Sequence, residues 1–243
     1  MVIMRLCDIN VGFGYDARNE LRIEREEFIK FISEDVFERV AVHPIYLTNI
    51  FDANSRIAGL MRHSSKVVGI ALINPLREDM AVSELDRITT FMRMSGAMLR
   101  PYIHGYSFAL QIVSDIIEAI YKFDLPIIVY CEHSFSPTMV KVQALQYSMV
   151  DFIVINGVQK YGYGEVSSLM RGCDNVFIST SLLPNYRDLR KIIEEFGPER
   201  VLFGSNYPYY DFNYELSKAK SAVKEDYEEE LIFRKNFIDL ILE

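Results

Sequence analysis

The chain has few cysteines and no membrane-spanning run. It contains three cysteines, Cys7, Cys131 and Cys173, and no pair of them has C-x-x-C spacing. This pattern argues against a disulfide framework and against a zinc knuckle. No segment reaches the roughly 18 apolar residues that a membrane helix requires, and the apolar stretch at the N-terminus is too short for a signal peptide. These absences predict a cytoplasmic protein in a reducing environment, without membrane partners.

Basic charge is also scarce. The 243 residues include 26 Lys and Arg against 34 Asp and Glu, so the net charge is −8. A surface that binds nucleic acid must neutralise phosphates with clustered basic residues, and the sequence contains no basic block. A nucleic acid is therefore excluded as an expected partner. Because no linker or low-complexity tract interrupts the chain, residues 1–243 are expected to form a single domain.

Short apolar runs alternate with longer amphipathic ones along the chain. Several of the short runs are rich in Val and Ile without polar alternation, which is typical of parallel strands covered on both faces. The expected strands are 3–9, 39–45, 67–73, 96–102, 126–131, 151–156, 175–181 and 200–206. Helical spacing predicts helices over 24–38, 107–123 and 185–196. This order predicts an α/β protein with the (β/α)8 TIM-barrel fold. A doubly wound open sheet is the alternative, but no G-x-G-x-x-G follows the first strand.

Polar residues follow most of the expected strands. In a TIM barrel the reactive groups lie at the carboxyl ends of the strands. The residues expected there are Asp8, Asn10, Gly12, Asn74, Arg100, His104, Tyr130, Cys131, Glu132, His133, Asn156, Ser179, Ser181 and Asn206. This ring is polar, but it is short of carboxylates and imidazoles.

Motifs along nearly the whole chain resemble those of the amidohydrolase superfamily, in the branch of compact barrels that includes decarboxylases and lactonases. Segment 8–14 resembles the opening D-x-H-x-H-f-G, segment 125–130 resembles l-P-v-l-i-H, and segment 200–208 resembles R-x-L-F-G-S-D-y-P. Further matches are 69–75, 96–101, 152–157, 175–181 and Asn236. The resemblance implies a TIM barrel of the metal-dependent-hydrolase type.

The positions that the resemblance assigns to metal ligands all carry other residues. The histidines of strand one fall on Asn10 and Gly12. Those of strands five and six fall on Tyr130 and Asn156, and the Asp of strand eight falls on Asn206. A catalytic zinc needs three or four nitrogen, sulfur or carboxylate ligands, and neutral amides are poor ligands for such a metal. Asn206 also cannot accept a proton as a general base. We therefore expect no metal cofactor at these positions.

Three hypotheses for function follow. In the first, the barrel has lost metal-dependent hydrolysis and binds a protein partner or a small molecule, which would be anionic if it contacts Arg100. The expected ligand-binding residues are Asn10, Arg100, His104, Tyr130, Asn156 and Asn206. The second is a metal-independent hydrolase or lactonase in which Asp8, Glu132 or His133 replaces the missing acid. The third is a displaced site for zinc or another divalent metal, built from Glu132, His133, His104 and Asp8.

The orientation of side chains bears on these hypotheses. Because side chains alternate along a strand, Asp8 is expected to point inward with Asn10 and Gly12. The same alternation separates Cys131 from Glu132, which argues against a thiol nucleophile with an adjacent base.

The remaining candidates have structural interpretations. His43 is expected in the loop after strand two, and His63 is expected to cap a helix C-terminus. The tyrosines that follow strand eight are expected to form a packed loop, with a pocket lid or a partner surface as the alternative; they are Tyr207, Tyr209, Tyr210 and Tyr214. Exposed aromatic residues near the barrel ends leave open a homo-oligomer.

Overall fold

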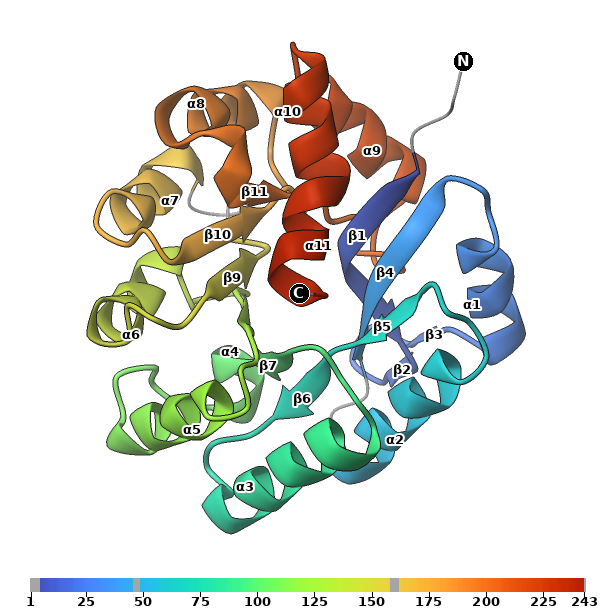
Figure 1. Cartoon of the computed structure of the whole chain (residues 1–243), viewed down its shortest axis with the longest axis vertical. Coiled ribbons are helices and arrows are strands. Elements are labelled where there is room, and N and C mark those ends of the chain that lie inside the picture. The colour runs from blue at the N-terminus through green and yellow to red at the C-terminus, as the bar shows by residue number, and fades with distance from the viewer. Residues whose placement is uncertain (1–4, 46–48, 158–161, 243) are drawn as a thin grey trace.

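The computed structural model describes residues 5–45, 49–157 and 162–242, in which an inner ring of strands is surrounded by helices (Figure 1). The barrel strands are β1 (Leu6–Phe13), β4 (Phe37–Pro44), β5 (Val67–Gly69), β6 (Ala71–Ile73), β7 (Ala97–Leu99), β8 (Ile127–Tyr130), β9 (Phe152–Ile155), β10 (Val176–Ser179) and β11 (Val201–Leu202). Elements β5 and β6 are two halves of one strand position, because only Ile70 separates them. The described residues therefore fill eight strand positions.

All neighbouring barrel strands pair in parallel. The order β1-β4-β5 forms one sheet and β6-β7-β8-β9-β10-β11 forms the other. Backbone hydrogen bonds connect the first strand position to the last: the amide of Ile9 donates to Phe203 O (2.9 Å), and that of Gly12 donates to Tyr207 O (2.7 Å). The chain has the (β/α)8 TIM-barrel fold.

The outer layer consists of helices that follow the strands. They are α1 (Arg25–Ile32), α2 (Ile50–Met61), α3 (Glu78–Asp86), α4 (Pro101–His104), α5 (Gln111–Tyr121), α6 (Lys141–Gln146), α7 (Gly162–Met170), α8 (Tyr186–Phe196), α9 (Phe212–Lys220), α10 (Asp226–Glu230) and α11 (Asn236–Ile241). Two π-helical segments are η1 (Arg87–Phe91) and η4 (Leu231–Lys235), and two 3₁₀ segments are η2 (Pro137–Val140) and η3 (Pro198–Arg200). A hairpin of β2 (Tyr15–Asp16) and β3 (Leu21–Arg22) follows the first strand.

The core has two parts. Inward-facing residues such as Ile9, Ile128 and Ile153 form one cluster, and it includes Phe237 and Ile241 of α11. Helix α11 crosses one end of the strand ring (Figure 1) and closes the barrel there. Asn236 fixes this helix, because its Nδ2 donates to Pro198 O and to Val201 O at 2.7 Å each. A larger cluster lies between the strands and the helices.

The observed boundaries correct several predictions. Strand β1 continues to Phe13, while residues 3 and 4 lie outside the described residues. The helix expected over 24–38 ends at Ile32, and a turn leads into β4 at Phe37. The strand expected over 96–102 ends at Leu99, because Pro101 begins α4, a position that suits proline.

The helix expected over 185–196 is confirmed as α8. Asn185 caps its first turn by accepting from the amide of Asp188 (3.1 Å). Gly197 ends the helix at φ 85°, in the region that favours glycine.

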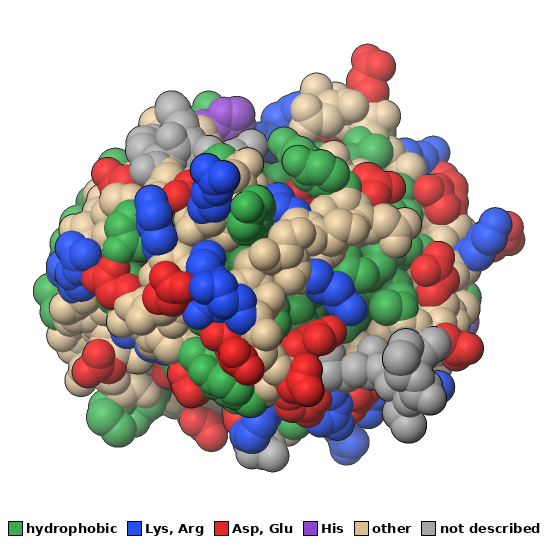
Figure 2. Space-filling model, turned by 90° about the horizontal axis from the view of Figure 1, so that it is seen from above, with side chains coloured by type: hydrophobic (Ala, Val, Ile, Leu, Met, Phe, Trp, Pro, Cys, Tyr) green, Lys and Arg blue, Asp and Glu red, His purple; other side chains and the backbone are tan. Residues whose placement is uncertain are grey.

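The structure also bears on the expected absence of membrane helices and disulfides. None of the helices within the described ranges is long and apolar enough to cross a bilayer. Acidic and basic side chains are interspersed on the face drawn in Figure 2. Cys7, Cys131 and Cys173 are all buried as free thiols.

Candidate functional site

The carboxyl ends of the barrel strands surround a cavity of about 830 Å³ at the open end of the barrel. We call it the mouth cavity. Its lining includes Asp16, Arg18, Asn19, Arg100, Tyr102, Tyr130, Glu132, His133, Asn156, Leu182, Asn206, Tyr209 and Tyr210. These residues come from strand ends far apart in the sequence, as the barrel topology predicts.

Asn10 lies at the centre of a buried hydrogen-bond network beneath this cavity. Its Nδ2 lies 3.0 Å from Asn156 Oδ1, 2.9 Å from Ser181 Oγ and 3.2 Å from Asn206 Oδ1. On its other side, Oδ1 of Asn10 lies 2.9 Å from Nε2 of His43.

Asn206 is the second centre of the network. Its Oδ1 also accepts from the hydroxyl of Tyr130 (2.9 Å) and lies 3.4 Å from Nδ2 of Asn156. We call the set Asn10, His43, Tyr130, Asn156, Ser181 and Asn206 the amide network. All its members are uncharged, because burial and the nearby positive charge of Arg100 lower the pKa of His43 to about 3.

The backbone places these side chains through two local features. The pairing of β1 with β4 shifts register between Asp8 and Val11, which indicates a β-bulge around Ile9 and Asn10. Gly204 permits close packing of the network, because a Cβ there would lie 2.3 Å from Ser179 Oγ and 2.5 Å from Ser181 Oγ.

Residues in the left-handed backbone region follow the last four strands. The φ angles are 53° at His133, 60° at Asn156, 57° at Leu182 and 57° at Asn206. Asparagine tolerates this region better than most residues, so Asn156 and Asn206 suit the backbone as well as the hydrogen bonds. Strained backbone of this kind concentrates at functional sites.

Asp8 does not join the ring of Asn10. Its neighbours Cys7 and Ile9 pack into the barrel interior, and the bulge separates its orientation from that of Asn10. Its Oδ1 accepts from the amides of Asn10 (2.9 Å) and Ser205 (3.0 Å), while Oδ2 has no hydrogen-bond partner among the described residues. Burial raises the pKa of the Asp8 carboxyl to about 7, despite these two donors. The expectation that Asp8 shares the orientation of Asn10 is therefore wrong.

Arg100 and Glu132 form a bidentate pair in the wall of the mouth cavity. Nη2 of Arg100 lies 3.0 Å from each carboxylate oxygen of Glu132, and Nε lies 3.2 Å from Oε1. The guanidinium also covers the Tyr130 ring at 4.2 Å. Although burial opposes the charge, Glu132 raises the pKa of Arg100. Glu132 is thus the counterion of a buried arginine, and Nη1 of Arg100 has no partner within the described ranges.

The β2–β3 hairpin supplies a second charged pair to the cavity wall. Asp16 accepts from the Tyr209 hydroxyl (2.8 Å) and from Asn19 Nδ2 (2.9 Å), and it pairs with Arg18 (3.3 Å). Although burial of Asp16 opposes the charged form, these donors lower its pKa to about 2. The charges of the lining therefore occur mainly as opposite pairs.

Two histidines lie elsewhere than expected. His104 is part of α4 and lines a separate cavity of about 400 Å³, so it does not join the mouth cavity. Burial lowers its pKa to about 4. His43 lies on β4, not in a loop, and is a buried member of the amide network. Alternation from the inward-facing Ala41 was the signal that could have identified His43.

The other candidates have largely structural positions. Burial raises the pKa of the Cys131 thiol far above its ordinary value, which disfavours the thiolate form. His63 contacts the carbonyl of Gly59 at the end of α2 (2.8 Å), as predicted for a cap. Tyr207 stacks on Phe31 (3.8 Å), whereas Tyr209 and Tyr210 line the mouth cavity.

The residues at the family's metal-ligand positions do not fit a transition metal. Three of them are amides that satisfy one another, and the fourth is a Tyr130 hydroxyl bonded to them. At Gly12 there is no side chain to serve as a ligand, and a Cβ there would lie 2.4 Å from Ile45 Cγ2, so a ligand side chain would require Ile45 to move. Within the described residues, no three His, Cys, Asp or Glu side chains are grouped to hold a metal ion. Glu132, His133, His104 and Asp8 do not form such a group.

The fold is similar to that of solved enzyme structures at low sequence identity. A 2,6-dihydroxybenzoate decarboxylase from Rhizobium aligns with TM-score 0.77 at 14% identity, covering 98% of both chains. A dihydroxybenzoic acid decarboxylase from Polaromonas, with bound manganese and 2-nitroresorcinol, aligns with TM-score 0.76 at 13% identity, covering 97% of this chain and 96% of the other.

A probable 2-pyrone-4,6-dicarboxylic acid hydrolase from Acinetobacter baumannii aligns with TM-score 0.73 at 14% identity, covering 98% of this chain and 99% of the other. No curated protein sequence matches the chain. The sequence model of the family described as "Amidohydrolase" matches residues 54–237, more than half of the chain. The chain belongs to the amidohydrolase family.

Proposed function

We propose that this barrel binds a small polar molecule in its mouth cavity and does not carry out the metal-dependent hydrolysis typical of its fold. The amide network carries this proposal. The residues that would hold a metal are uncharged and bonded to one another at 2.9–3.4 Å. Neutral amides are poor ligands for transition metals, and Asn206 cannot serve as a base.

The ligand class follows from the groups that face the cavity. Nδ2 of Asn206 donates no hydrogen bond to the described residues, so a ligand oxygen can accept from it. Arg18 is 44% exposed in its side chain and can contact an anionic group. Tyr102 and Tyr209 supply aromatic surface. We propose a small ring compound with hydroxyl and carboxylate groups, a class represented by the 2,6-dihydroxybenzoate of the similar decarboxylase.

Calorimetric titration with 2,6-dihydroxybenzoate tests the binding proposal. We expect saturable binding without added metal, weakened about tenfold by Asn206→Ala and by Arg18→Gln, which corresponds to about 1.4 kcal/mol. The exposed Asn213 provides the matched control, and Asn213→Ala should leave the affinity unchanged. Absence of binding, or equal affinity in all variants, would contradict the proposed ligand site.

Metal analysis tests the catalytic half of the proposal. Protein purified without chelator should contain no stoichiometric zinc or manganese, and a panel of lactones and amides should show no metal-stimulated turnover. Stoichiometric metal that is lost in Asn10→Ala and Asn206→Ala would refute this half.

A metal-independent lactonase is the second candidate. It is favoured by one observation: His133 lines the mouth cavity, and its ring lies 4.4 Å from the Tyr102 ring at an interplanar angle of 30°, so an imidazole faces the cavity. Turnover of a lactone in the presence of chelator that disappears in His133→Gln would support this candidate over pure binding.

A further inference from the structure

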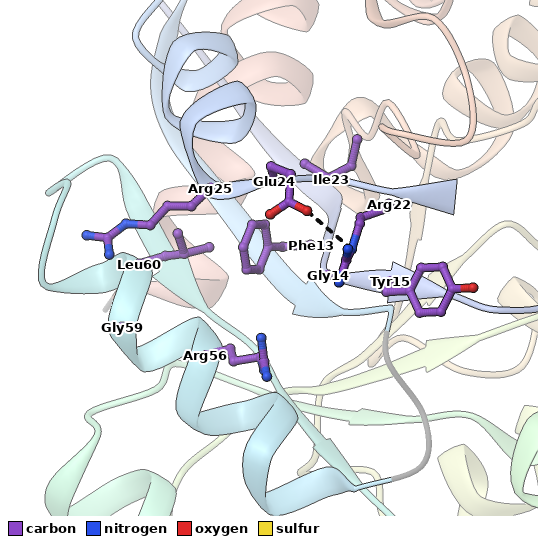
Figure 3. Close-up of a pocket in the computed structure, with 10 residues that line it drawn as sticks. All are labelled: Phe13, Gly14, Tyr15, Arg22, Ile23, Glu24, Arg25, Arg56, Gly59 and Leu60. Atoms are coloured by element: carbon purple, nitrogen blue, oxygen red, sulfur yellow. Dashed lines mark ion pairs between the residues drawn. The ribbon is translucent and has the colours of Figure 1, made fainter. Parts of the chain in front are cut away.

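A second groove lies outside the barrel mouth, between the β2–β3 hairpin, the start of α1 and helix α2. It has a volume of about 500 Å³ and contains Arg22, Arg25 and Arg56, so we call it the arginine groove. Figure 3 shows the side chains around it. Pockets that bind small molecules have about 300–1,000 Å³.

The charge of the groove opposes that of the whole chain. Three arginines from three elements line it beside one carboxylate, Glu24, although the net charge of the protein is −8. Arg22 pairs with Glu24 at 3.2 Å, and Arg56 pairs with Asp52 at 2.8 Å. No ion pair or hydrogen bond of the Arg25 side chain occurs within the described part of the chain.

The two ion pairs can exchange partners easily. Their side chains are 44–69% exposed, and pairs at such positions contribute little stability. A phosphate group can therefore replace Glu24 at Arg22 at small cost. Arginine also matches the geometry of phosphate oxygens through two parallel N–H donors.

The floor of the groove is apolar. Phe13, Ile23 and Leu60 line it, with Phe13 in the middle of the labelled side chains, Leu60 next to Arg25 and Ile23 at the edge beside Arg22 (Figure 3). Ile23 and Leu60 are buried. Charged groups around an apolar floor suit a ligand that has both an anionic group and an apolar body.

Gly59 leaves open space along the groove. It lies inside α2, where glycine costs about 1 kcal/mol relative to alanine. Nothing in the described structure requires glycine, because a Cβ there would meet only Arg62 Nη2, at 3.9 Å. Gly59 lines the groove, so the missing side chain leaves space next to the arginines.

From this combination we propose that the arginine groove is a second binding site, for a phosphate monoester with an apolar body. The groove lies away from the amide network, and the proposal is independent of the ligand of the mouth cavity. The charge, the apolar floor and the space at Gly59 each favour one part of such a ligand.

Calorimetric titration with phenyl phosphate tests this proposal. We expect one saturable site, weakened about tenfold by Arg25→Gln and by Arg56→Gln, equal to about 1.4 kcal/mol each. Arg171 is similarly exposed and pairs with Glu195, so Arg171→Gln is the matched control and should bind like the wild type. Phenol, which lacks the phosphate, should not bind measurably.

The variant Gly59→Leu distinguishes a loss of ligand binding from a loss of protein stability. Leucine is a better helix former and fills the groove, so thermal stability should be kept or raised while phenyl phosphate binding is lost. Unchanged affinity in Gly59→Leu, or equal affinity in Arg25→Gln and Arg171→Gln, would overturn the proposal. Binding of an acidic peptide but not of phenyl phosphate would also overturn it.

Discussion

Replacement of Asp8 by asparagine should make the stability of this protein less dependent on pH. Asp8 is fully buried, and its pKa is raised from 3.8 to about 7 by burial. In the unfolded chain the same carboxyl has a pKa of about 3.9. Between these values the folded state binds more protons than the unfolded state, so the wild type loses stability as pH rises from about 4 to about 7.

The size of the expected stability difference follows from the pKa shift of Asp8. A difference of about three pKa units corresponds to about 4 kcal/mol, and relaxation around the ionised carboxylate reduces this to about 2–4 kcal/mol. The introduced asparagine would keep an acceptor for the amides of Asn10 and Ser205, because both bond to a single oxygen of Asp8, Oδ1. Asp8→Asn should therefore match the wild type near pH 4, exceed it by about 1 kcal/mol at pH 5 and exceed it by about 2–4 kcal/mol at pH 8.

Urea denaturation of both proteins at pH 5, 6, 7 and 8 measures this difference, and other titrating groups cancel between them. Asp16→Asn is the control with the opposite sign, because the pKa of Asp16 is lowered to about 2. It should lose stability relative to the wild type above about pH 4. If the free energies of unfolding of the wild type and of Asp8→Asn differ by the same amount at pH 5 and at pH 8, Asp8 is not held protonated in the folded protein.

Three further predictions concern close contacts. Gly204→Ala should lower the free energy of unfolding by about 1–3 kcal/mol in urea titrations, because its Cβ would meet Ser179 Oγ at 2.3 Å; wild-type stability would show that the serines can move away. Asn236→Ala should cost about 1–3 kcal/mol, since the buried carbonyls of Pro198 and Val201 lose their 2.7 Å donor; an unchanged denaturation midpoint would contradict this. Cys131 should react with a disulfide reagent at pH 8 only after denaturation, because burial raises its thiol pKa; rapid labelling of native protein would contradict the buried thiol.

Much of the fold could be predicted because the strands are continuous apolar runs. Such runs have few alternative conformations in a sheet that is covered on both sides. The same apolar runs show where each strand ends, and the carboxyl ends of parallel strands meet at one end of a barrel. Asn10, Tyr130, Asn156 and Asn206 were therefore expected near one another.

The remainder depended on features that the sequence pattern does not encode. The β-bulge at Ile9 and Asn10 breaks simple alternation, so the orientation of Asp8 was predicted wrongly. The bidentate contact between Arg100 and Glu132 depends on side-chain conformers from two strands, and the arginine groove joins a hairpin to two helices. Such contacts arise from tertiary packing.

The β2–β3 hairpin forms part of both cavities. Tyr15 and Arg22 line the arginine groove, whereas Asp16 and Arg18 line the mouth cavity. A ligand in the groove that favours one position of the hairpin changes the affinity of the mouth cavity by some factor. Thermodynamic linkage requires the mouth ligand to change the affinity of the groove by the same factor. The hairpin thus makes the barrel a candidate for cooperativity between two sites. The coupling free energy could be measured by titrating either ligand in the presence of the other.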